Sequence, residues 1–514
     1  MPIKKMIASR KTKMPMFEDP DAAAEGAAKP LSGSLADNEA WLKHTFSNCS
    51  DLTVRKLHLR HSVPGIVVYF KELVDARQLD EELLEPLMRQ RPERGDNDIS
   101  FMEQIKSDLV PVALTQIIDN KKDAVARIIK GEVVLIADNS AQALAINVKS
   151  TMHRALSEPS TESVIRGPKI GFIENIGINQ ALLRRNIRTP RLKMEQMLVG
   201  KVSQTEVALA YMEGAASPAV IAEVKKRMSQ IELDTILESA FIEEIIRDAA
   251  YSPFPVIHVT ERPDSAAASL LEGRVVILVD GSPVSMIVPV NIWHAFQTVE
   301  DYYTNYIFAT FLRWLRYFFA FISLTLPSFY VAVSEFNPEL IPTTLAMTLA
   351  AAREPVPFPT LIEILMMEIA FEAIREAGIR LPRPVGQTIS IVGVLVIGQA
   401  AVQAGIVSAP IVIIVSLTGI ASFLIPNYNM SQAIRLMRFP LMLCAGIFGL
   451  YGVGAGLIAL LIHLVNLRSF GVYYMAPLAP FDRDGIKDVL GRAPWWIMQK
   501  RKNRVWPTQE LSKQ

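Results

Sequence analysis

The polar side chains with the most chemical potential in this sequence lie inside its apolar C-terminal half. The segment 385–407 is apolar overall, yet on a helix one of its faces carries Thr388, Val392, Leu395, Gln399 and Gln403. Polar groups at membrane depth have to be satisfied by neighbouring helices or by water in a channel. Two interpretations follow from these residues alone: the polar face lines an ion pathway, or it hydrogen-bonds adjacent helices.

A stripe of carboxylates forms the second set of candidate groups. Glu368, Glu372 and Glu376 follow one another at four-residue spacing, which places them on one face of a helix over residues 360–378. Carboxylates are costly at the bilayer centre, so these must face water, a partner or a pore. The segment forms either an acidic vestibule that concentrates cations, or an interfacial helix whose glutamates pair with Arg375, Arg380 and Arg383.

Bilayer-length apolar segments position these groups. No Asp, Glu, Lys or Arg occurs in residues 384–434 or 439–467, although a span needs only about 20 apolar residues. We predict an α-helical transmembrane domain of four to five spans within residues 305–467. The expected spans are 317–334, kinked at Pro327, then 385–407, 409–425 and 439–465, with a proline-containing loop over 335–359. A G-x-x-x-G motif at Gly452 and Gly456 predicts close helix packing in the last span.

Membrane topology depends on whether the glutamate-rich segment crosses. If it does not, the spans are even in number and the basic tail, residues 468–514, returns to the cytoplasm as the positive-inside rule prefers. That choice leaves Arg435 and Arg438 outside. Arg313 and Arg316 precede the first span and no signal peptide is present, so the N-terminal region is predicted to be cytoplasmic.

The N-terminal half contains an internal repeat. Residues 131–148 match residues 273–290 at an offset of 142 positions, and each copy alternates β-branched residues around an Asp-Asn-Ser or Asp-Gly-Ser turn. This pattern predicts two hairpins and, with them, an α/β region of two related subdomains, 41–150 and 151–300, after a flexible tail over residues 1–40. We interpret the paired turns as hairpin chemistry rather than as ligand loops.

The segment 169–191 between the copies is expected to hold a strand and then a helix that closes on Arg184 and Arg185. These arginines could bind a phosphate or an anionic headgroup. Basic residues near a helix C-terminus also complement its dipole, which is the interpretation we favour.

Composition excludes several functional classes. The 53 basic and 52 acidic residues nearly cancel, which argues against a nucleic-acid partner. No phosphate loop, zinc-ligand spacing or nucleophile elbow occurs in the N-terminal region, and the two cysteines, Cys49 and Cys444, suit neither a disulfide nor a metal site. We therefore predict a membrane protein that is not an enzyme and carries no cofactor or metal.

Several runs of the chain resemble the A subunits of the spore germinant receptors of endospore-forming bacteria. The resemblance covers roughly residues 40–495 and follows the same order along both halves. The stretches that carry it are IGFIENIGINQALLRR (170–185), YSPFPVIHVTERPD (251–264), LLEGRVVILVDGSP (270–283), EDYY (300–303), residues 353–415 from REPVPFP to PIVIIV, and SFGVYYMAPLAPF (469–481).

The resemblance implies a receptor in the inner membrane of the dormant spore, with a transporter-like B subunit and a lipoprotein C subunit as partners. It implies that A subunits form a homo-oligomer, a pentamer embedded in lipid, that acts as a nutrient-gated ion channel and triggers germination by ion release. Thr388, Val392 and Leu395 would then form the pore constriction, with Gln399 and Gln403 offering polar atoms to a partly dehydrated ion. The glutamates become vestibule or gate-coupling candidates.

Three other functions stay open at this point. Related germination channels amplify ion release without responding directly to a nutrient. A membrane transporter with its own substrate site and a non-conducting scaffold are the remaining alternatives.

Overall fold

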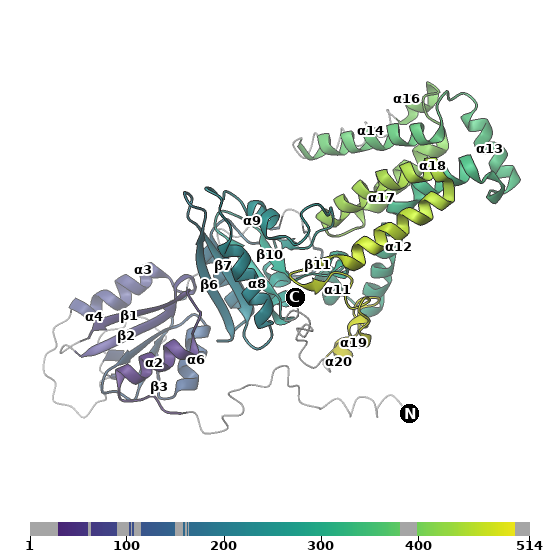
Figure 1. Cartoon of the computed structure of the whole chain (residues 1–514). Coiled ribbons are helices and arrows are strands. Elements are labelled where there is room, and N and C mark those ends of the chain that lie inside the picture. Colours follow the sequence, from purple (N-terminus) through teal and green to yellow (C-terminus); the bar gives the residue numbers. More distant parts are fainter. Residues whose placement is uncertain are drawn as a thin grey trace, which may run out of the picture. The chain divides into compact units, whose positions relative to one another are not determined.

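The computed structural model describes residues 29–59, 63–89, 102–103, 105–106, 115–149, 158–159, 162, 164–380 and 398–498. The chain divides into an α/β unit and a helical unit (Figure 1). The α/β unit contains residues up to 247, residues 257–289 and the last residues from 494 onward, and the helical unit contains residues 248–256 and 290–493.

Two five-stranded antiparallel sheets form the α/β unit, and they share one strand order. The first runs β1-β2-β4-β5-β3, with β1 (Leu52–His58), β2 (Pro64–Phe70), β3 (Thr115–Ile118), β4 (Val133–Ala137) and β5 (Ala143–Ile146). The second runs β6-β7-β9-β10-β8, with β6 (Leu192–Val199), β7 (Thr205–Met212), β8 (His258–Thr260), β9 (Val275–Val279) and β10 (Ser285–Val288). The predicted α/β class with two related subdomains is therefore present.

Helices cover these sheets. In the first subdomain they are α2 (Leu35–Thr45), α3 (Ala76–Gln78), α4 (Glu85–Arg89) and α6 (Lys121–Ile129), with short turns η2 (Lys71–Leu73) and η3 (Leu79–Leu84). In the second they are α7 (Ile176–Asn186), α8 (Pro218–Ser229), α9 (Ser239–Ile246) and α10 (Pro263–Leu271). The central strand β4 is buried on both faces, because its alternate side chains enter two separate apolar clusters. Both faces being covered explains why its sequence is an unbroken apolar run rather than an alternating one.

The paired turns hold the helix that opens each subdomain. The Asp138 carboxylate accepts the Leu35 N–H at 3.0 Å, and the Asp280 carboxylate accepts the Ile176 N–H at 3.2 Å. Asn38 and Asn179 also occupy equivalent places in the two subdomains. Each side chain accepts a hydrogen bond from the N–H, and donates one to the C=O, of the residue six positions upstream. The turn aspartates thus dock helices α2 and α7, which supports their interpretation as structural residues.

The helical unit begins with η4 (Ile292–Phe296) and α11 (Glu300–Tyr303) and continues with α12 (Tyr306–Phe336), η5 (Pro338–Leu340), α13 (Thr343–Arg353) and α14 (Thr360–Arg380). It then contains α16 (Gly398–Gln403), α17 (Ala409–Phe423), α18 (Tyr428–Asn466), β11 (Arg468–Ser469), β12 (Val472–Tyr473) and α19 (Arg483–Ile486), while α20 (Trp495–Met498) follows at the end of the described chain. Within the described residues, α12 and α18 are long and apolar enough to cross a membrane, and α17 is a shorter apolar helix.

Helix α18 is a hairpin rather than one rod. Gly449 has φ 59° and ψ −141°, a conformation open to glycine but not to residues with a side chain, and the chain reverses there. The two arms pack on each other: a Cβ added to Gly456 would lie 2.6 Å from Cδ1 of Leu441, and one added to Gly452 would collide with the carbonyl of Cys444. The glycines of the G-x-x-x-G motif therefore face the other arm of their own helix.

The structure differs from the sequence expectations in several places. The expected loop over 335–359 contains helix α13, because its alanine- and leucine-rich stretch lies between the prolines. Residues 169–175, all within the described part of the chain, form no strand. The fold starts before residue 40, since Leu31 is buried and α2 begins at Leu35, and residues 468–493 belong to the helical unit instead of forming a tail.

The turn at Gly449 gives a sharp prediction. Gly449→Ala should lower the melting temperature of the purified protein by about 5 °C or more, because it imposes a strained φ and places a Cβ 2.8 Å from Phe336 Cγ. The matched control is Gly454→Ala in the same helix, where no described atom lies within 4 Å of the added Cβ. Equal melting temperatures for the two variants would contradict the hairpin.

Candidate functional site

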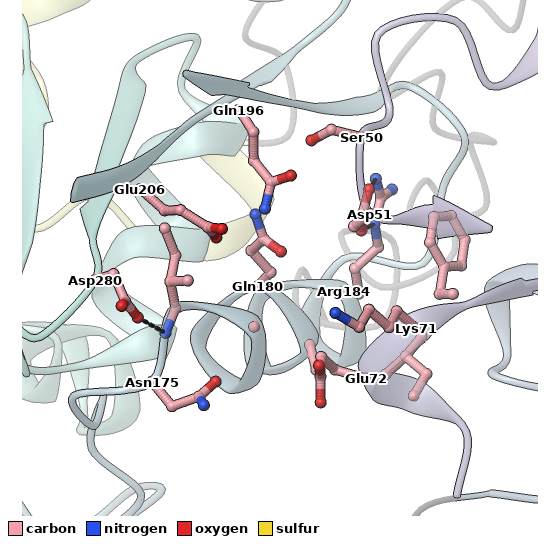
Figure 2. Close-up of a pocket in the computed structure, with 15 residues that line it drawn as sticks. Ser50, Asp51, Lys71, Glu72, Asn175, Gln180, Arg184, Gln196, Glu206 and Asp280 are labelled. Carbon is pink, nitrogen blue, oxygen red and sulfur yellow. Dashed lines mark hydrogen bonds and ion pairs between the residues drawn. The ribbon is translucent and has the colours of Figure 1, made fainter. Parts of the chain in front are cut away.

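A cavity of about 390 Å³ lies in the α/β unit, between the two subdomains. Segments from both copies of the repeat line it: the residues before β1 and those of η2 from the first, and α7, β6, β7 and the β9–β10 turn from the second. Its polar lining consists of Ser50, Asp51, Lys71, Glu72, Asn175, Gln180, Arg184, Gln196, Glu206 and Asp280 (Figure 2).

One buried amide in this cavity has an unused donor. Gln180 is 3% exposed, and its Nε2 has no hydrogen-bond partner in the described part of the chain. Figure 2 shows the side chains of Gln180 and Gln196 pointing toward each other across the cavity. Buried polar atoms are normally satisfied, so the cavity suits water or a small polar molecule that presents both donors and acceptors.

A buried ion pair in the lining of the cavity joins the two subdomains. Arg184 on α7 binds Asp51 through two hydrogen bonds, Nε to Oδ2 at 2.7 Å and Nη2 to Oδ1 at 2.9 Å. Its Nη1 donates to the carbonyl of Leu192 at 2.8 Å, and the guanidinium stacks 4.2 Å from the Phe70 ring centroid. Burial opposes the charged form, but the charge and hydrogen bonds of Asp51 outweigh it and raise the pKa of Arg184.

Backbone pairing reinforces this junction. The segment before β1 runs along the outer edge of β6, where the Met194 N–H donates to Asn48 and the Ser50 N–H donates to Met194, both at 2.9 Å. A strand edge that would otherwise be open is thereby covered by the other subdomain. Arg184 is therefore fully engaged inside the protein and is not a free phosphate ligand. It lies in the last turn of α7, as the helix-dipole interpretation expected, but that interpretation did not include its main partner, Asp51.

The glutamate stripe of α14 is neutralised by arginines of α18. Glu368 and Arg438 are 0% and 1% exposed, and Oε2 lies 2.5 Å from Nη1. One turn further along, Glu372 pairs with Arg435 at 2.5 Å. Glu376 is exposed and pairs with Arg380 on its own helix. The predicted pairing of these glutamates with arginines is confirmed for Arg380 and for Arg375, whose Nη1 lies 3.9 Å from Glu372 Oε1, while Arg383 lies outside the described residues. Arg435 and Arg438, the partners at 2.5 Å, were not predicted.

The Glu368–Arg438 pair connects four helices. The Arg438 guanidinium donates to the Ser323 hydroxyl of α12 at 2.9 Å, and the Thr418 hydroxyl of α17 lies 3.3 Å from Glu368 Oε1. A buried ion pair with such additional hydrogen bonds tolerates an apolar environment. Removing one partner lowers the free energy of unfolding by about 3–5 kcal/mol, because the other charge is then buried alone. Helix α14 is therefore held inside the bundle.

A second charge cluster fixes the start of α12. Arg313 is 0% exposed and contacts Asp301 and Asp488, both at 3.4 Å, while Arg316 binds Asp301 at 2.9 Å. Both arginines form ion pairs inside the protein. The topology prediction had used them as positive charges that flank the first span.

The pore-lining candidates divide into two groups. Thr388, Val392 and Leu395 lie outside the described residues. Gln399 and Gln403 lie on α16, and both are exposed.

Comparison with known proteins decides the family. A family model described as the Bacillus/Clostridium GerA spore germination protein matches residues 40–504. The chain belongs to the GerA family of spore germination proteins. The resemblance found in the sequence is thereby confirmed.

Individual GerA relatives cover nearly the whole chain. The uncharacterized membrane protein YfkQ of Bacillus subtilis is 45% identical over 92% of this chain and 91% of its own. Spore germination protein KA of B. subtilis is 43% identical over 92% and 87%, and spore germination protein A1 of B. subtilis is 38% identical over 90% and 94%. The crystal structure of the N-terminal domain of the A subunit of the Bacillus megaterium spore germinant receptor GerK3 matches 51% of this chain and 98% of its own, at 34% identity and a TM-score of 0.42.

Sequence reasoning missed three features of this GerA protein: the Asp51–Arg184 pair, the orphan amide of Gln180 and the turn at Gly449. The partners of the pair are 133 positions apart, and no local pattern links them. Gly449 is one of several glycines in its segment, and only backbone geometry separates it from the others.

The buried pair between the subdomains can be tested by a mutant cycle. Asp51→Asn and Arg184→Met should each lower the melting temperature of the purified full-length protein by about 8 °C, since breaking a buried pair costs roughly 3 kcal/mol. The double variant should melt no lower than the worse single variant, because the uncompensated charge is then gone. Arg77→Met is the control, since this arginine belongs to an exposed ion pair and its side chain is 83% exposed. Additive losses in the double variant would show that the two residues do not act together.

Proposed function

We propose that this GerA protein is the membrane subunit of a spore germinant receptor that oligomerises, as a pentamer, into a nutrient-gated ion channel in the inner spore membrane. Ion release through it starts germination, with a transporter-like B subunit and a lipoprotein C subunit as partners. Family membership supports the germination role, because named relatives such as KA and A1 are spore germination proteins.

The channel proposal rests on two polar side chains, Gln399 and Gln403, which are exposed on α16 although the other residues of this helix are small or apolar. Helix α16 ends close to the start of α14, at one end of the bundle, where exposed amides are satisfied by water or by a neighbouring subunit. A ring of copies around a pore supplies both: Thr388, Val392 and Leu395 form the constriction, and the two glutamines face the ion path.

The carboxylates take different roles in this proposal. Glu368 and Glu372 are paired with Arg438 and Arg435, so they cannot serve as an open vestibule. They act as gate-coupling residues, since they tie α14 to the bundle and α14 leads directly into the proposed pore segment. Glu376, exposed on the same stripe, remains the vestibule candidate.

The helical unit also supports a membrane topology. Phe336 at the end of α12 meets Gly449, and Leu361 at the start of α14 meets Gly446, so these points share one end of the bundle. Ser422 near the end of α17 meets Arg375 and Ser431, which lie toward the opposite end. Helices α12 and α14, α17 and the two arms of α18 therefore each run between the same two ends.

We propose six passes through the membrane: the described helices α12, α14, α17 and the two arms of α18, together with the span predicted from the sequence over residues 385–407. An arm over residues 428–448 is about 31 Å long at 1.5 Å per residue, enough for a bilayer core of about 30 Å. With an even number, both the N-terminal region and the C-terminal tail lie in the cytoplasm although α14 crosses.

Cysteine labelling tests this topology. In a variant lacking Cys49 and Cys444, a membrane-impermeant maleimide should label Tyr451→Cys from outside intact cells, because Tyr451 is 81% exposed beside the turn. Tyr428→Cys and Asn466→Cys should react only after permeabilisation. Labelling of Tyr428→Cys and Asn466→Cys from opposite sides would show that α18 crosses once.

Single-channel recording tests conduction. The purified protein in a planar bilayer should show discrete cation-selective openings, and Val392→Ala should make them more frequent, since a smaller side chain weakens a closed apolar constriction. Val394→Ala is the matched control, because helical spacing places residue 394 on the opposite face. Silence from an intact oligomer would favour a scaffold or a transporter instead.

A further inference from the structure

A buried cluster of oxygen atoms without partners lies between α14, α17 and α12. Glu363 and Thr360 are 0% exposed and Ser408 is 1% exposed. Oε1 of Glu363 and the hydroxyls of Thr360 and Ser408 accept and donate no hydrogen bond within the described residues. None of these three residues belongs to the glutamate stripe or to the proposed pore face.

Contacts across three helices bring these groups together. Thr360 and Glu363 are one turn apart on α14, and the Ser408 N–H donates to Glu363 Oε2 at 2.9 Å. Ser408 is the N-cap of α17, yet its hydroxyl makes no capping bond. The Tyr330 hydroxyl of α12 is also buried and has no hydrogen-bond partner in the described chain, and the Tyr330 side chain packs against the apolar cluster that contains Ile364 of α14 and Ile411 of α17.

The carboxylate of Glu363 is incompletely satisfied. One oxygen receives a single backbone hydrogen bond, while the other faces Arg353 Nε at 3.6 Å, too far for a hydrogen bond. Arg353 Nε has no hydrogen-bond partner within the described residues either. A buried carboxylate in an apolar bundle is costly without close polar partners, and among the described residues Glu363 has only the Ser408 N–H at hydrogen-bond distance and Arg353 at 3.6 Å.

We propose that Glu363, Thr360, Ser408 and Tyr330 form a binding site for a monovalent alkali cation. A carboxylate and three hydroxyl oxygens are hard ligands, the class that alkali and alkaline-earth ions prefer. One negative charge balances a single positive charge. The described residues contain no group of three or more His, Cys, Asp or Glu side chains such as a divalent ion would favour.

Arg353 acts as a tethered competitor at this site. Its side chain is 26% exposed and lies at the end of the short helix α13, so it can withdraw when a cation enters. The site needs only the helical unit, and its existence does not depend on conduction through a pore.

Thermal unfolding measures occupancy directly. The full-length protein in detergent is melted in KCl, NaCl or N-methyl-D-glucamine chloride at equal ionic strength. An alkali cation should raise the melting temperature saturably, by about 5 °C well above the dissociation constant, because the ligand binds the folded state. Saturable binding of ⁸⁶Rb⁺ to the same preparation, displaced by KCl, provides the second readout.

Variants connect the effect to the site. Glu363→Gln should abolish the cation-dependent shift, and Ser408→Ala, which keeps the backbone N–H, should raise the half-saturating concentration several-fold. Arg353→Gln should lower it. Glu376→Gln is the matched control, an exposed carboxylate on the same helix that is paired with Arg380.

Two results would overturn the proposal. One is an identical melting temperature in potassium, sodium and N-methyl-D-glucamine, which means that water alone fills the cluster. The other is an unchanged cation dependence in both Glu363→Gln and Ser408→Ala. Because neither readout measures current, a silent bilayer recording with intact ⁸⁶Rb⁺ binding would reject the channel and leave the cation site standing.

Discussion

Buried ion pairs between separate elements determine how this protein assembles, because a charge in an apolar interior needs an opposite charge beside it. Arg184 and Asp51 hold the two subdomains of the α/β unit together. Arg438 and Glu368 connect four helices of the helical unit, and Arg313 with its aspartates fixes the start of α12. Apolar packing alone would permit many registers between such helices, whereas a buried pair permits only those that bring its partners together.

The repeated architecture could be predicted from the sequence, because hairpin turns and apolar runs are patterns of neighbouring residues. Strands β4 and β5 and helix α6 recur as β9, β10 and α10 at the offset of 142 positions found in the sequence. Hairpin turns and apolar runs depend on neighbouring residues, so one chain is enough to recognise them. Helix α7 lies 141 positions after α2, one position fewer than the offset between the hairpins. The hairpin residues alone do not predict this difference.

The candidate sites were less predictable, because they depend on long-range partners. The sequence shows that Glu368 and Glu372 share a helix face, but it does not show which face of which helix opposes them. Arg435 and Arg438 were expected outside the membrane in the topology where the glutamate-rich segment does not cross, whereas three-dimensional packing buries both side chains inside the bundle. The cluster around Glu363 was invisible for the same reason, since its oxygens come from residues 330, 360, 363 and 408.

The number of proposed membrane passes depends on one local feature, the turn at Gly449. Residues 439–465 form one apolar run, and hydropathy counts the run as one span because it records composition and not backbone direction. A single glycine with positive φ turns that run into part of two antiparallel arms. The six-pass topology proposed above rests on this turn, and in that topology a crossing α14 is compatible with a cytoplasmic basic tail. Arg435 and Arg438 are bound to the glutamates of α14, so the charges of both helices are neutralised within the bundle.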